Sequence, residues 1–220
     1  PTKGESYTVN ESHILSLRCS YTLDKIIRRD PVKETIRQNQ PFMKDKIIDI
    51  AVCDFLQLPN TYQNHLLKGY RVAIEFPEQK LDIDPYILGY WLGDGMSKTS
   101  GITFSRSLQN YNLINNKHIP YVFLCNSREN RLKLLAGLMD SDGSCCKNGF
   151  DIIQKKEALL DDIIFLARSL GFAAYKNICE KSCMYKGKKR IGTYYRTNIH
   201  GAGTEEIPVK CLRKKAAPRK

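Results

Sequence analysis

Two aspartates, each followed by glycine, are the residues of this chain best suited to do chemistry. Asp94 lies near the end of the stretch Ile87–Gly95, and Asp142 lies at the same place in the similar stretch Leu135–Gly143. In helices, each carboxylate would lie at the negative end of a helix dipole, and two such carboxylates brought together repel each other. A divalent cation removes this repulsion, and hard oxygen ligands suit Mg²⁺, with Mn²⁺ as a substitute. Metal ions held in this way support phosphodiester hydrolysis.

Small residues recur one helical turn apart in both stretches. They are Gly89, Gly93, Gly137 and Ser141. This spacing lets two helix backbones approach closely, so we expect the helices to pack side by side and to bring Asp94 and Asp142 together. The glycine after each aspartate can take a left-handed helix cap. The alternative is that both aspartates are acidic helix ends that bind no metal.

The elements that must position the aspartates are mixed α and β. Asp84-Pro85 is a typical helix start, and a second helix is expected after Arg128–Arg131. Both helices are apolar on nearly every face, as buried helices are. Around them we predict strands at 101–105 and 149–154, a helix at 157–170 closed by Gly171, and strands at 174–185 and 191–199 around a basic turn at 186–190. Before residue 81 the pattern predicts strands at 7–9, 46–52 and 70–77 and a helical turn at 54–59.

Composition limits the class of protein. A hydrophobic fraction of 42% is enough for a buried core, and no apolar run approaches the roughly 18–20 residues of a membrane span. The chain starts at Pro1 without a signal-like stretch, so we expect a piece of a longer intracellular product, nuclear in a eukaryotic host. Its eight cysteines follow no zinc or disulfide spacing and are expected to be reduced thiols.

Positive charge is concentrated at the end of the chain. The net charge is +12, and residues 161–220 contribute +9 of it, from 14 Lys and Arg against 5 Asp and Glu. Such a block suits a polyanion, because each neutralised phosphate releases counterions. An ordinary solvated basic face is the alternative.

The two aspartate stretches carry a family resemblance. Leu135–Gly143, LAGLMDSDG, departs at two positions from the motif of the LAGLIDADG homing endonucleases, and Ile87–Gly95 resembles the same motif. Asn115–Pro120 and Ser127–Arg131 resemble the run before the second motif in intein-encoded members. The resemblance implies an α+β fold with two αββαββα halves about a pseudo-two-fold axis and an antiparallel sheet that lies as a saddle in the DNA major groove. Only 48 positions separate Asp94 from Asp142, so the first half is expected to be shortened.

Site residues follow from the resemblance. Asp94 and Asp142 correspond to the metal-binding catalytic acids, with the backbone carbonyls of Gly93 and Ser141 as further ligands. Gln154 resembles the polar residue that positions the attacking water, although a solvent-facing glutamine is an equal alternative. The basic residue near the scissile phosphate is left open among Lys155, Arg196 and His200.

A DNA-facing strand is predicted near the end of the chain. Alternation places four polar side chains on one face, namely Tyr194, Arg196, Asn198 and His200. The basic turn before them, with Lys186, Lys188, Lys189 and Arg190, would reach phosphates of double-stranded DNA. A half-exposed strand with no DNA partner would also be polar on one face.

The flanks resemble parts of an intein. Thr8–Leu17 resembles the motif whose histidine, here His13, activates the N-terminal splice peptide, and Asn10 stands where Thr is usual. Glu206–Ala216 resembles the segment that returns to the splicing domain. We therefore predict a partial splicing domain and connection at 1–80, an endonuclease domain at 81–200 and a returning basic segment at 201–220. The chain lacks the terminal splicing residues, so we expect no splicing by it alone.

The leading hypothesis is a monomeric, Mg²⁺-dependent, sequence-specific endonuclease that makes a double-strand cut and is carried inside a host protein. One alternative is a degenerate domain that binds DNA without cutting it. The other is an insert that only supports protein splicing.

Overall fold

The structure is a computed structural model that describes residues 8–22, 42–95, 102–185 and 188–218. The chain divides into two compact units, Pro1–Tyr70 and Arg71–Lys220. Our predicted boundary after residue 80 lies ten residues further along the chain. In the described ranges, no helix combines the length and apolar character needed to cross a membrane.

The first unit is a small antiparallel sheet with short helical turns. Strands β1 (Ile14–Cys19), β2 (Ile47–Ala51) and β3 (Leu67–Lys68) lie in the order β2-β1-β3. Helix α2 (Val52–Gln57) and a π-helical turn, η1 (Tyr62–Leu66), follow β2 and cover a core that includes Cys19, Ile48 and Leu66. The predicted strand at 46–52 and helical turn at 54–59 are confirmed. The strand predicted at 7–9 is wrong for Thr8 and Val9, which precede a turn, and Tyr7 lies outside the described residues.

The second unit contains most of the helices and a four-stranded sheet. Its elements are α3 (Pro85–Asp94), α4 (Ile102–Asn110), α5 (Tyr121–Leu124), α6 (Arg128–Ser141), β4 (Ser144–Cys146), β5 (Gly149–Gln154), α7 (Glu157–Ser169), β6 (Asn177–Tyr185), β7 (Lys188–His200) and the 3-10 turns η2 (Thr204–Glu206) and η3 (Leu212–Lys214). The predicted mixed α+β class with an antiparallel sheet is therefore confirmed. From α6 onward the order is helix, two strands, helix, two strands. Between α3 and α6, the described residues form two helices and no strand.

Helix α3 begins where the sequence predicts, whereas α6 begins at Arg128, before the start expected after Arg131. The Asp84 carboxylate accepts a hydrogen bond from the Ile87 backbone N–H at 3.1 Å, and Pro85 occupies the first helical turn. The Ser127 hydroxyl accepts one from the Asn130 N–H at 3.4 Å. Side-chain caps of this kind satisfy backbone donors that have no partner inside the helix.

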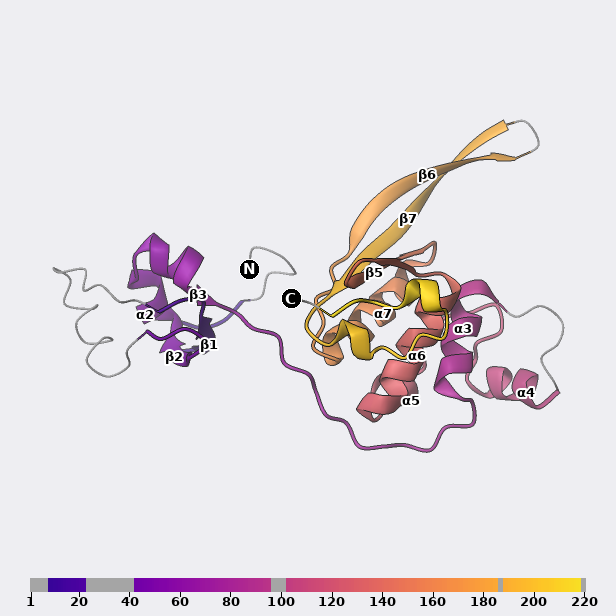
Figure 1. The fold of residues 1–220 in the computed structure, drawn as a ribbon, viewed down its shortest axis with the longest axis horizontal. Coiled ribbons are helices and arrows are strands. Elements are labelled where there is room, and N and C mark those ends of the chain that lie inside the picture. The colour runs from indigo at the N-terminus through magenta and orange to yellow at the C-terminus, as the bar shows by residue number, and fades with distance from the viewer. Residues whose placement is uncertain (1–7, 23–41, 96–101, 186–187, 219–220) are drawn as a thin grey trace. The chain divides into compact units, whose positions relative to one another are not determined.

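Glycines allow α3 and α6 to pack side by side (Figure 1). A Cβ built at Gly89 would lie 2.1 Å from the Leu134 carbonyl oxygen, and one built at Gly137 would lie 2.1 Å from the Tyr86 carbonyl oxygen. Each helix thus contributes a glycine where the backbone of the other passes. The predicted close packing through small residues is confirmed.

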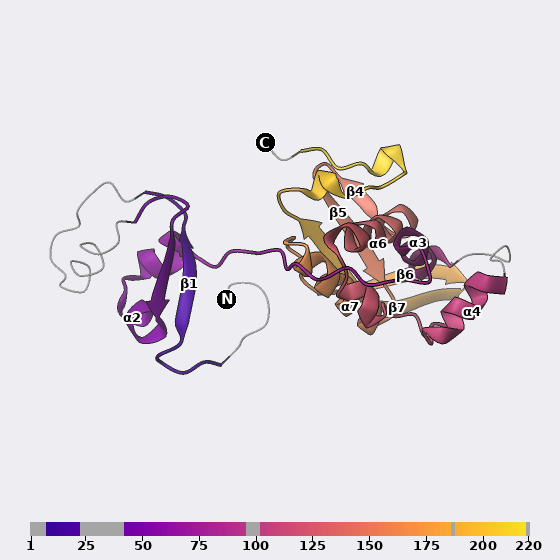
Figure 2. The same cartoon turned by 90° about the horizontal axis from the view of Figure 1, so that it is seen from below.

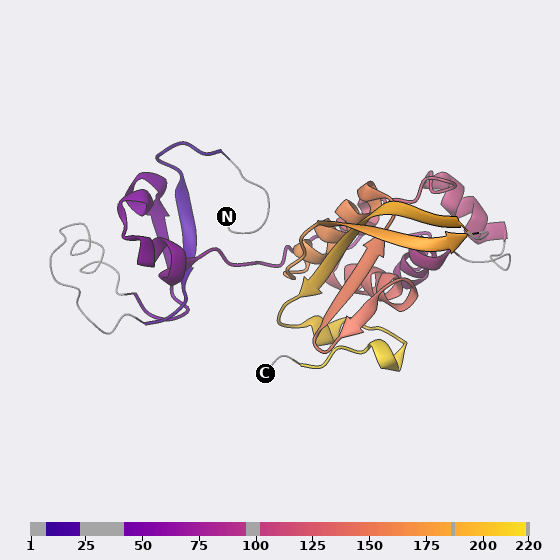
Figure 3. The same ribbon diagram turned by 90° about the horizontal axis from the view of Figure 1, so that it is seen from above.

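The four-stranded sheet has the order β4-β5-β7-β6, and all its pairs are antiparallel. One face contributes Phe150, Ile152 and Ile199 to the core, with α6 and α7 on that side (Figure 2). No helix covers the other face of the sheet, which is turned toward the viewer in Figure 3. The β6–β7 hairpin continues past the helices of this unit (Figure 1). Alternation along the strands therefore produces one core face and one open face.

A buried arginine joins three segments beneath this sheet. Arg131 is fully buried and donates hydrogen bonds to the carbonyl oxygens of Asn126, Ser169 and Ile74. Its guanidinium also lies 5.0 Å from the centre of the Phe76 ring. The arginine in the run before the second motif thus has a structural role here.

Four local predictions in the second unit are wrong. The strand predicted at 101–105 is part of helix α4 for residues 102–105, and Gly101 lies outside the described residues. The strand predicted at 70–77 is an irregular segment that pairs with no strand among the described residues. Neither glycine forms the predicted left-handed cap: Gly95 has φ +72° but ψ 129°, and Gly143 does not have a positive φ. Of the basic turn predicted at 186–190, residues 188–190 belong to β7, and residues 186 and 187 lie outside the described residues.

The segment from residue 201 packs within the second unit. Ile207 and Ala216 are buried in its core. The Ala217 N–H donates to the Lys147 carbonyl at 3.0 Å. Among the described residues, the predicted returning segment therefore forms part of the same unit as α6.

Candidate catalytic centre

Asp142 lies at the end of α6, against the end of α3. A Cβ built at Gly93 would be 3.3 Å from the Asp142 Cγ, so the carboxyl group lies beside the residue that precedes Asp94. The Asp142 side chain is exposed, and its Oδ2 accepts a hydrogen bond from Gln154 Nε2 at 2.9 Å. The exposed Asp94 is the last residue of α3. Both aspartates therefore stand at the same end of the helix pair.

Gln154 is buried rather than facing solvent, so that alternative is wrong. Only 8% of its surface is exposed, because it projects from the core side of β5. Its amide reaches Asp142 from beneath the sheet. In this position Gln154 can fix the orientation of a carboxylate, which differs from the water-positioning role implied by the family resemblance.

Lys117 is a basic residue whose charge interacts with both aspartates. Its Nζ donates to the carbonyl oxygens of Leu92 and Gly93, each at 3.0 Å. Burial lowers the pKa of Lys117, while Asp142 and Asp94 act in the opposite direction. The ammonium is thus partly withdrawn from water and is held at the end of α3 by the carbonyls of its last turn. The sequence reasoning missed this residue, although it lies in Asn115–Pro120, which the resemblance had singled out.

A second lysine holds the end of α6 in a similar way. Lys214 Nζ donates to the carbonyl oxygens of Met139, Asp140 and Ser141, at 2.9, 2.9 and 3.2 Å. A positive charge is favourable at a helix C-terminus, where carbonyls have no partner inside the helix. The two carbonyls expected as further metal ligands, those of Gly93 and Ser141, therefore each accept a hydrogen bond from a lysine.

The donor set fits a hard divalent cation only in part. Two exposed carboxylates on adjoining helix ends are oxygen ligands of the kind that Mg²⁺ takes. Within the described ranges, no cluster of three or more His, Cys, Asp or Glu side chains could hold a metal ion. Any ion here would thus have Asp94 and Asp142 as its side-chain ligands, and other oxygens would come from water, backbone or a bound phosphate.

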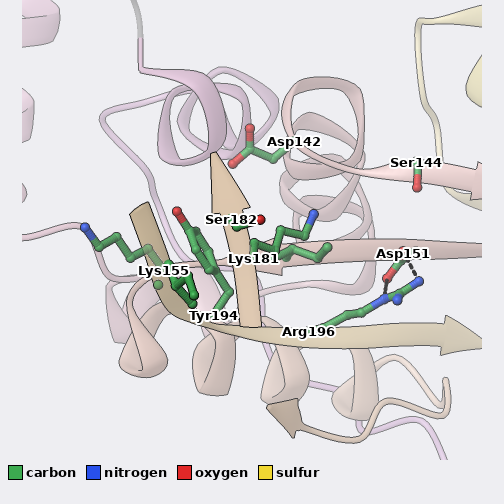
Figure 4. Close-up of a pocket in the computed structure, with 11 residues that line it drawn as sticks. Asp142, Ser144, Asp151, Lys155, Lys181, Ser182, Tyr194 and Arg196 are labelled. Atoms are coloured by element: carbon green, nitrogen blue, oxygen red, sulfur yellow. Dashed lines mark hydrogen bonds and ion pairs between the residues drawn. The ribbon is translucent and has the colours of Figure 1, made fainter. Parts of the chain in front are cut away.

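A groove of about 930 Å³ opens beside Asp142 over the uncovered face of the sheet (Figure 4). Strands β5, β6 and β7 form much of its floor, and Lys155, Lys181, Tyr194 and Arg196 line it together with Asp142. The lining from β5 also includes the carboxylate of Asp151, which pairs with Arg196. The acid at the end of α6 and the polar face of the sheet thus border the same open space.

The predicted DNA-facing residues are brought together only in part. Tyr194 and Arg196 line the groove. Asn198 pairs with Asp151 and His200 with Gly149, so both lie further along the same sheet face. Lys186 lies outside the described residues, and of Lys188, Lys189 and Arg190 only the backbone in β7 is described.

The three candidates for the basic catalytic residue lie in different surroundings. Lys155 is exposed in the groove just after β5. Arg196 is held in an ion pair by Asp151. His200 lies beside Gly149 at the far end of the sheet, where its backbone pairs with Ala173. Of the predicted bases only Lys155 shares the groove without an ion-pair partner among the described residues.

The splicing-motif residues lie in the first unit. Asn10 and His13 are exposed, and the Asn10 carbonyl accepts a hydrogen bond from the His13 N–H at 3.2 Å. The His13 carbonyl accepts another from Val52 at 2.9 Å. Both residues therefore belong to the turn that leads into β1.

The seven cysteines with described side chains are free thiols, as predicted.

Comparison with known proteins identifies part of the chain. The replicative DNA helicase DnaB of Mycobacterium intracellulare is 32% identical over 132 residues, which are 50% of this chain and 22% of that protein. The chain thus spans about a fifth of the length of this relative. The model of the homing endonuclease family matches residues 118–218, which include α6, the four-stranded sheet and Asp142. Residues 118–218, just under half of the chain, are therefore similar to the homing endonuclease family.

Proposed function

We propose that this chain is the endonuclease part of an intein and makes a sequence-specific, Mg²⁺-dependent double-strand cut in DNA by phosphodiester hydrolysis. The observation that carries the proposal is the contact at Gly93. Gly93 has no side chain, so the Asp142 carboxyl group can lie against the backbone of the residue that precedes Asp94. Two helix ends that each carry an exposed carboxylate can share one cation.

The surrounding residues have distinct parts in this proposal. Asp94 and Asp142 hold the metal, and Gln154 orients Asp142 through its 2.9 Å hydrogen bond. When bound, Mg²⁺ supplies Lewis-acid stabilisation to phosphate oxygens. Lys117 adds a fixed positive charge beside both acids, where negative charge develops on the phosphate during hydrolysis.

The open face of the sheet is the proposed DNA-binding surface. Duplex DNA admits a β-ribbon in its major groove, where base edges are distinguishable. The lining side chains Lys155, Lys181 and Arg196 are cationic, which suits a polyanion. Because this face adjoins Asp142, DNA bound there would bring a phosphate close to the acids.

The intein assignment explains the pattern of similarity. The relative carries the name of a helicase, yet the match covers 22% of it, as expected for a domain inserted in a host protein. Asn10 and His13 would then belong to the splicing domain, and the host protein would be a covalent partner. The second candidate, a domain that binds DNA without cutting it, is favoured by one observation: the described residues between α3 and α6 contain no strand.

Linearisation of a supercoiled plasmid library with randomised inserts tests the proposal. We expect Mg²⁺-dependent double-strand cutting by the wild-type chain and a loss of at least about 10²-fold in Asp94→Asn and in Asp142→Asn. Asp82→Asn, which changes another exposed acid of the same unit, is the matched control and should cut normally. Salt-dependent duplex binding without cutting would select the second candidate, and neither activity would exclude both.

A further inference from the structure

The floor of the groove contains an arginine held by a carboxylate. Arg196 Nε donates to Asp151 Oδ1 at 2.8 Å, and Nη2 donates to Oδ2 at 2.7 Å (Figure 4). The Asp151 side chain is only 11% exposed, whereas that of Arg196 is 45% exposed. The acid is therefore part of the sheet surface, and the guanidinium extends from it toward the open space.

The pairing leaves a defined part of the guanidinium available. A guanidinium has five N–H donors in a planar fork, and the two toward Asp151 occupy one edge. No other residue in the described ranges accepts a hydrogen bond from Arg196, so the edge formed by Nη1 and the second hydrogen of Nη2 can still donate two parallel bonds. A fork that is already oriented loses less freedom when it binds.

A carboxylate beside this arginine disfavours a phosphate as its partner. Asp151 offsets the positive charge that would attract a phosphate and would itself repel one. It does not block a base edge, which is uncharged. Among the four bases, only guanine presents two acceptors, N7 and O6, side by side in the major groove.

We infer that Arg196, positioned by Asp151, reads a guanine in the major groove of the target duplex. This inference rests on the proposed function, because it assigns one base to the same DNA-binding face. Asp151 acts through Arg196 and does not itself contact the base. The recognition sequence then contains a position at which guanine is preferred because of this pair.

Binding selection from a pool of randomised duplexes with the full chain, without added divalent cation, tests the inference. Wild-type protein should enrich duplexes that carry guanine at one particular position. Its affinity should be about 5-fold to 150-fold higher with guanine than with another base there, which is the range for a bidentate arginine–guanine contact. Arg196→Met removes every donor of the side chain, so it should lose that preference, while affinity for unselected duplex should fall by the loss of one positive charge at most. Lys181→Ala, in the same groove, should weaken binding to all sequences and leave the guanine preference intact.

Asp151→Ala gives the sharpest result. We expect guanine discrimination to fall while affinity for unselected duplex is unchanged or higher, since a negative charge leaves the DNA face. A purely structural ion pair would instead lower both quantities together, which overturns the inference. Guanine preference that survives in Arg196→Met and in Asp151→Ala also overturns it.

Failure of the wild-type chain to retain any duplex would overturn the proposed function as well, so failure of the inference and failure of the proposed function are distinguishable. Thermal melting of each variant establishes that it is folded.

Discussion

Gly93 and Ser141 occupy the tightest contact between α3 and α6 near the aspartates. A Cβ built at Gly93 would lie 2.0 Å from Ser141 Oγ and 2.8 Å from Ser141 Cβ. The same atom would lie 3.3 Å from Asp142 Cγ. The separation of the two helix ends, and with it the position of Asp142, is therefore set by the absence of a side chain at residue 93.

Gly93→Ala should destabilise the second unit and reduce cleavage. Overpacking costs about 1–3 kcal/mol, which exceeds the roughly 1 kcal/mol gained from the better helix propensity of alanine. Ser141→Gly removes both clashing atoms, so the double variant Gly93→Ala/Ser141→Gly should recover part of the loss, with a coupling of about 1 kcal/mol. Trp91, the single tryptophan, lies in α3 and reports unfolding of this unit by fluorescence. Strictly additive effects of the two substitutions would contradict the contact.

Gln154→Ala should reduce cleavage by about 10-fold to 100-fold, because residues that orient a ligand have effects of this size. The reason is the loss of the 2.9 Å hydrogen bond that fixes Asp142. Duplex binding in a gel-shift titration should change little, since Gln154 is buried. Ile153→Ala is the control, because Ile153 is the neighbouring residue but lines the groove. This variant leaves the hydrogen bond between Gln154 and Asp142 in place, so its cleavage rate with bound DNA should stay close to that of the wild type. A weaker affinity in Gln154→Ala with an unchanged cleavage rate would show that the residue belongs to the binding surface.

Lys117→Met should lower cleavage by about 10²–10³-fold at saturating DNA, because it removes the positive charge beside both acids. Lys214→Met is the matched variant, since this lysine also donates to the last carbonyls of a helix but touches neither acid. It should mainly lower stability, by about 1–3 kcal/mol. Equal losses of cleavage in the two variants would assign both lysines to helix capping alone.

The same lysine gives a pH dependence. Burial holds the pKa of Lys117 below its ordinary value of 10.5, so the ammonium loses its proton at a lower pH than an exposed lysine does. Cleavage that requires the charged form should therefore decline on the alkaline side before pH 10.5 is reached. Rates of single turnover against pH measure this decline, and the residual activity of Lys117→Met should lack it. An identical alkaline decline in that variant would assign the titration to another group.

Asp140→Ala should destabilise the second unit by about 2–3 kcal/mol, the scale for loss of hydrogen bonds to a charged group. Its carboxylate accepts hydrogen bonds from the backbone N–H groups of Lys210 and Cys211 and from the Tyr86 hydroxyl. Tyr86→Phe removes one of these bonds and should cost about 1 kcal/mol. Hydrogen exchange of 204–218 should accelerate in Asp140→Ala more than in Tyr86→Phe. Unchanged exchange would mean that the buried Ile207 and Ala216 hold the segment without this carboxylate.

Helices α3 and α6 and their contact are determined by local sequence. The predicted cap at Asp84 and the predicted spacing of small residues are short-range signals, and each corresponds to the same feature in the structure. The cap at Ser127 is equally local but was not predicted. Helix α3 is less buried than its apolar sequence predicts, because Ile87 and Tyr90 are exposed. The strands from β5 onward were also predictable, because their apolar residues alternate and their ends carry glycine or basic residues.

Short-range patterns were ambiguous where a segment depends on its neighbours. Residues 102–105 are β-branched and aromatic in part, which favours a strand. They are helical because Phe104, Ser107, Leu108 and Tyr111 recur at helical spacing and turn one face toward the core. Residues 70–77 alternate like a strand but pair with no strand in the part of the chain that the structure describes. The Ile74 backbone N–H donates one hydrogen bond to the Ser169 carbonyl oxygen.

The surroundings of the aspartates were decided only by the tertiary structure. Lys117 reaches carbonyls 24 and 25 residues earlier in the chain, and Asp140 holds backbone groups 70 and 71 residues later. The Asp151–Arg196 pair joins two strands separated by 45 residues. Sequence by itself determined which acids stand at helix ends, because a helix end is fixed by adjacent residues. The charged groups that lie near those acids depend on how segments far apart in the sequence pack together. No local pattern encodes that packing.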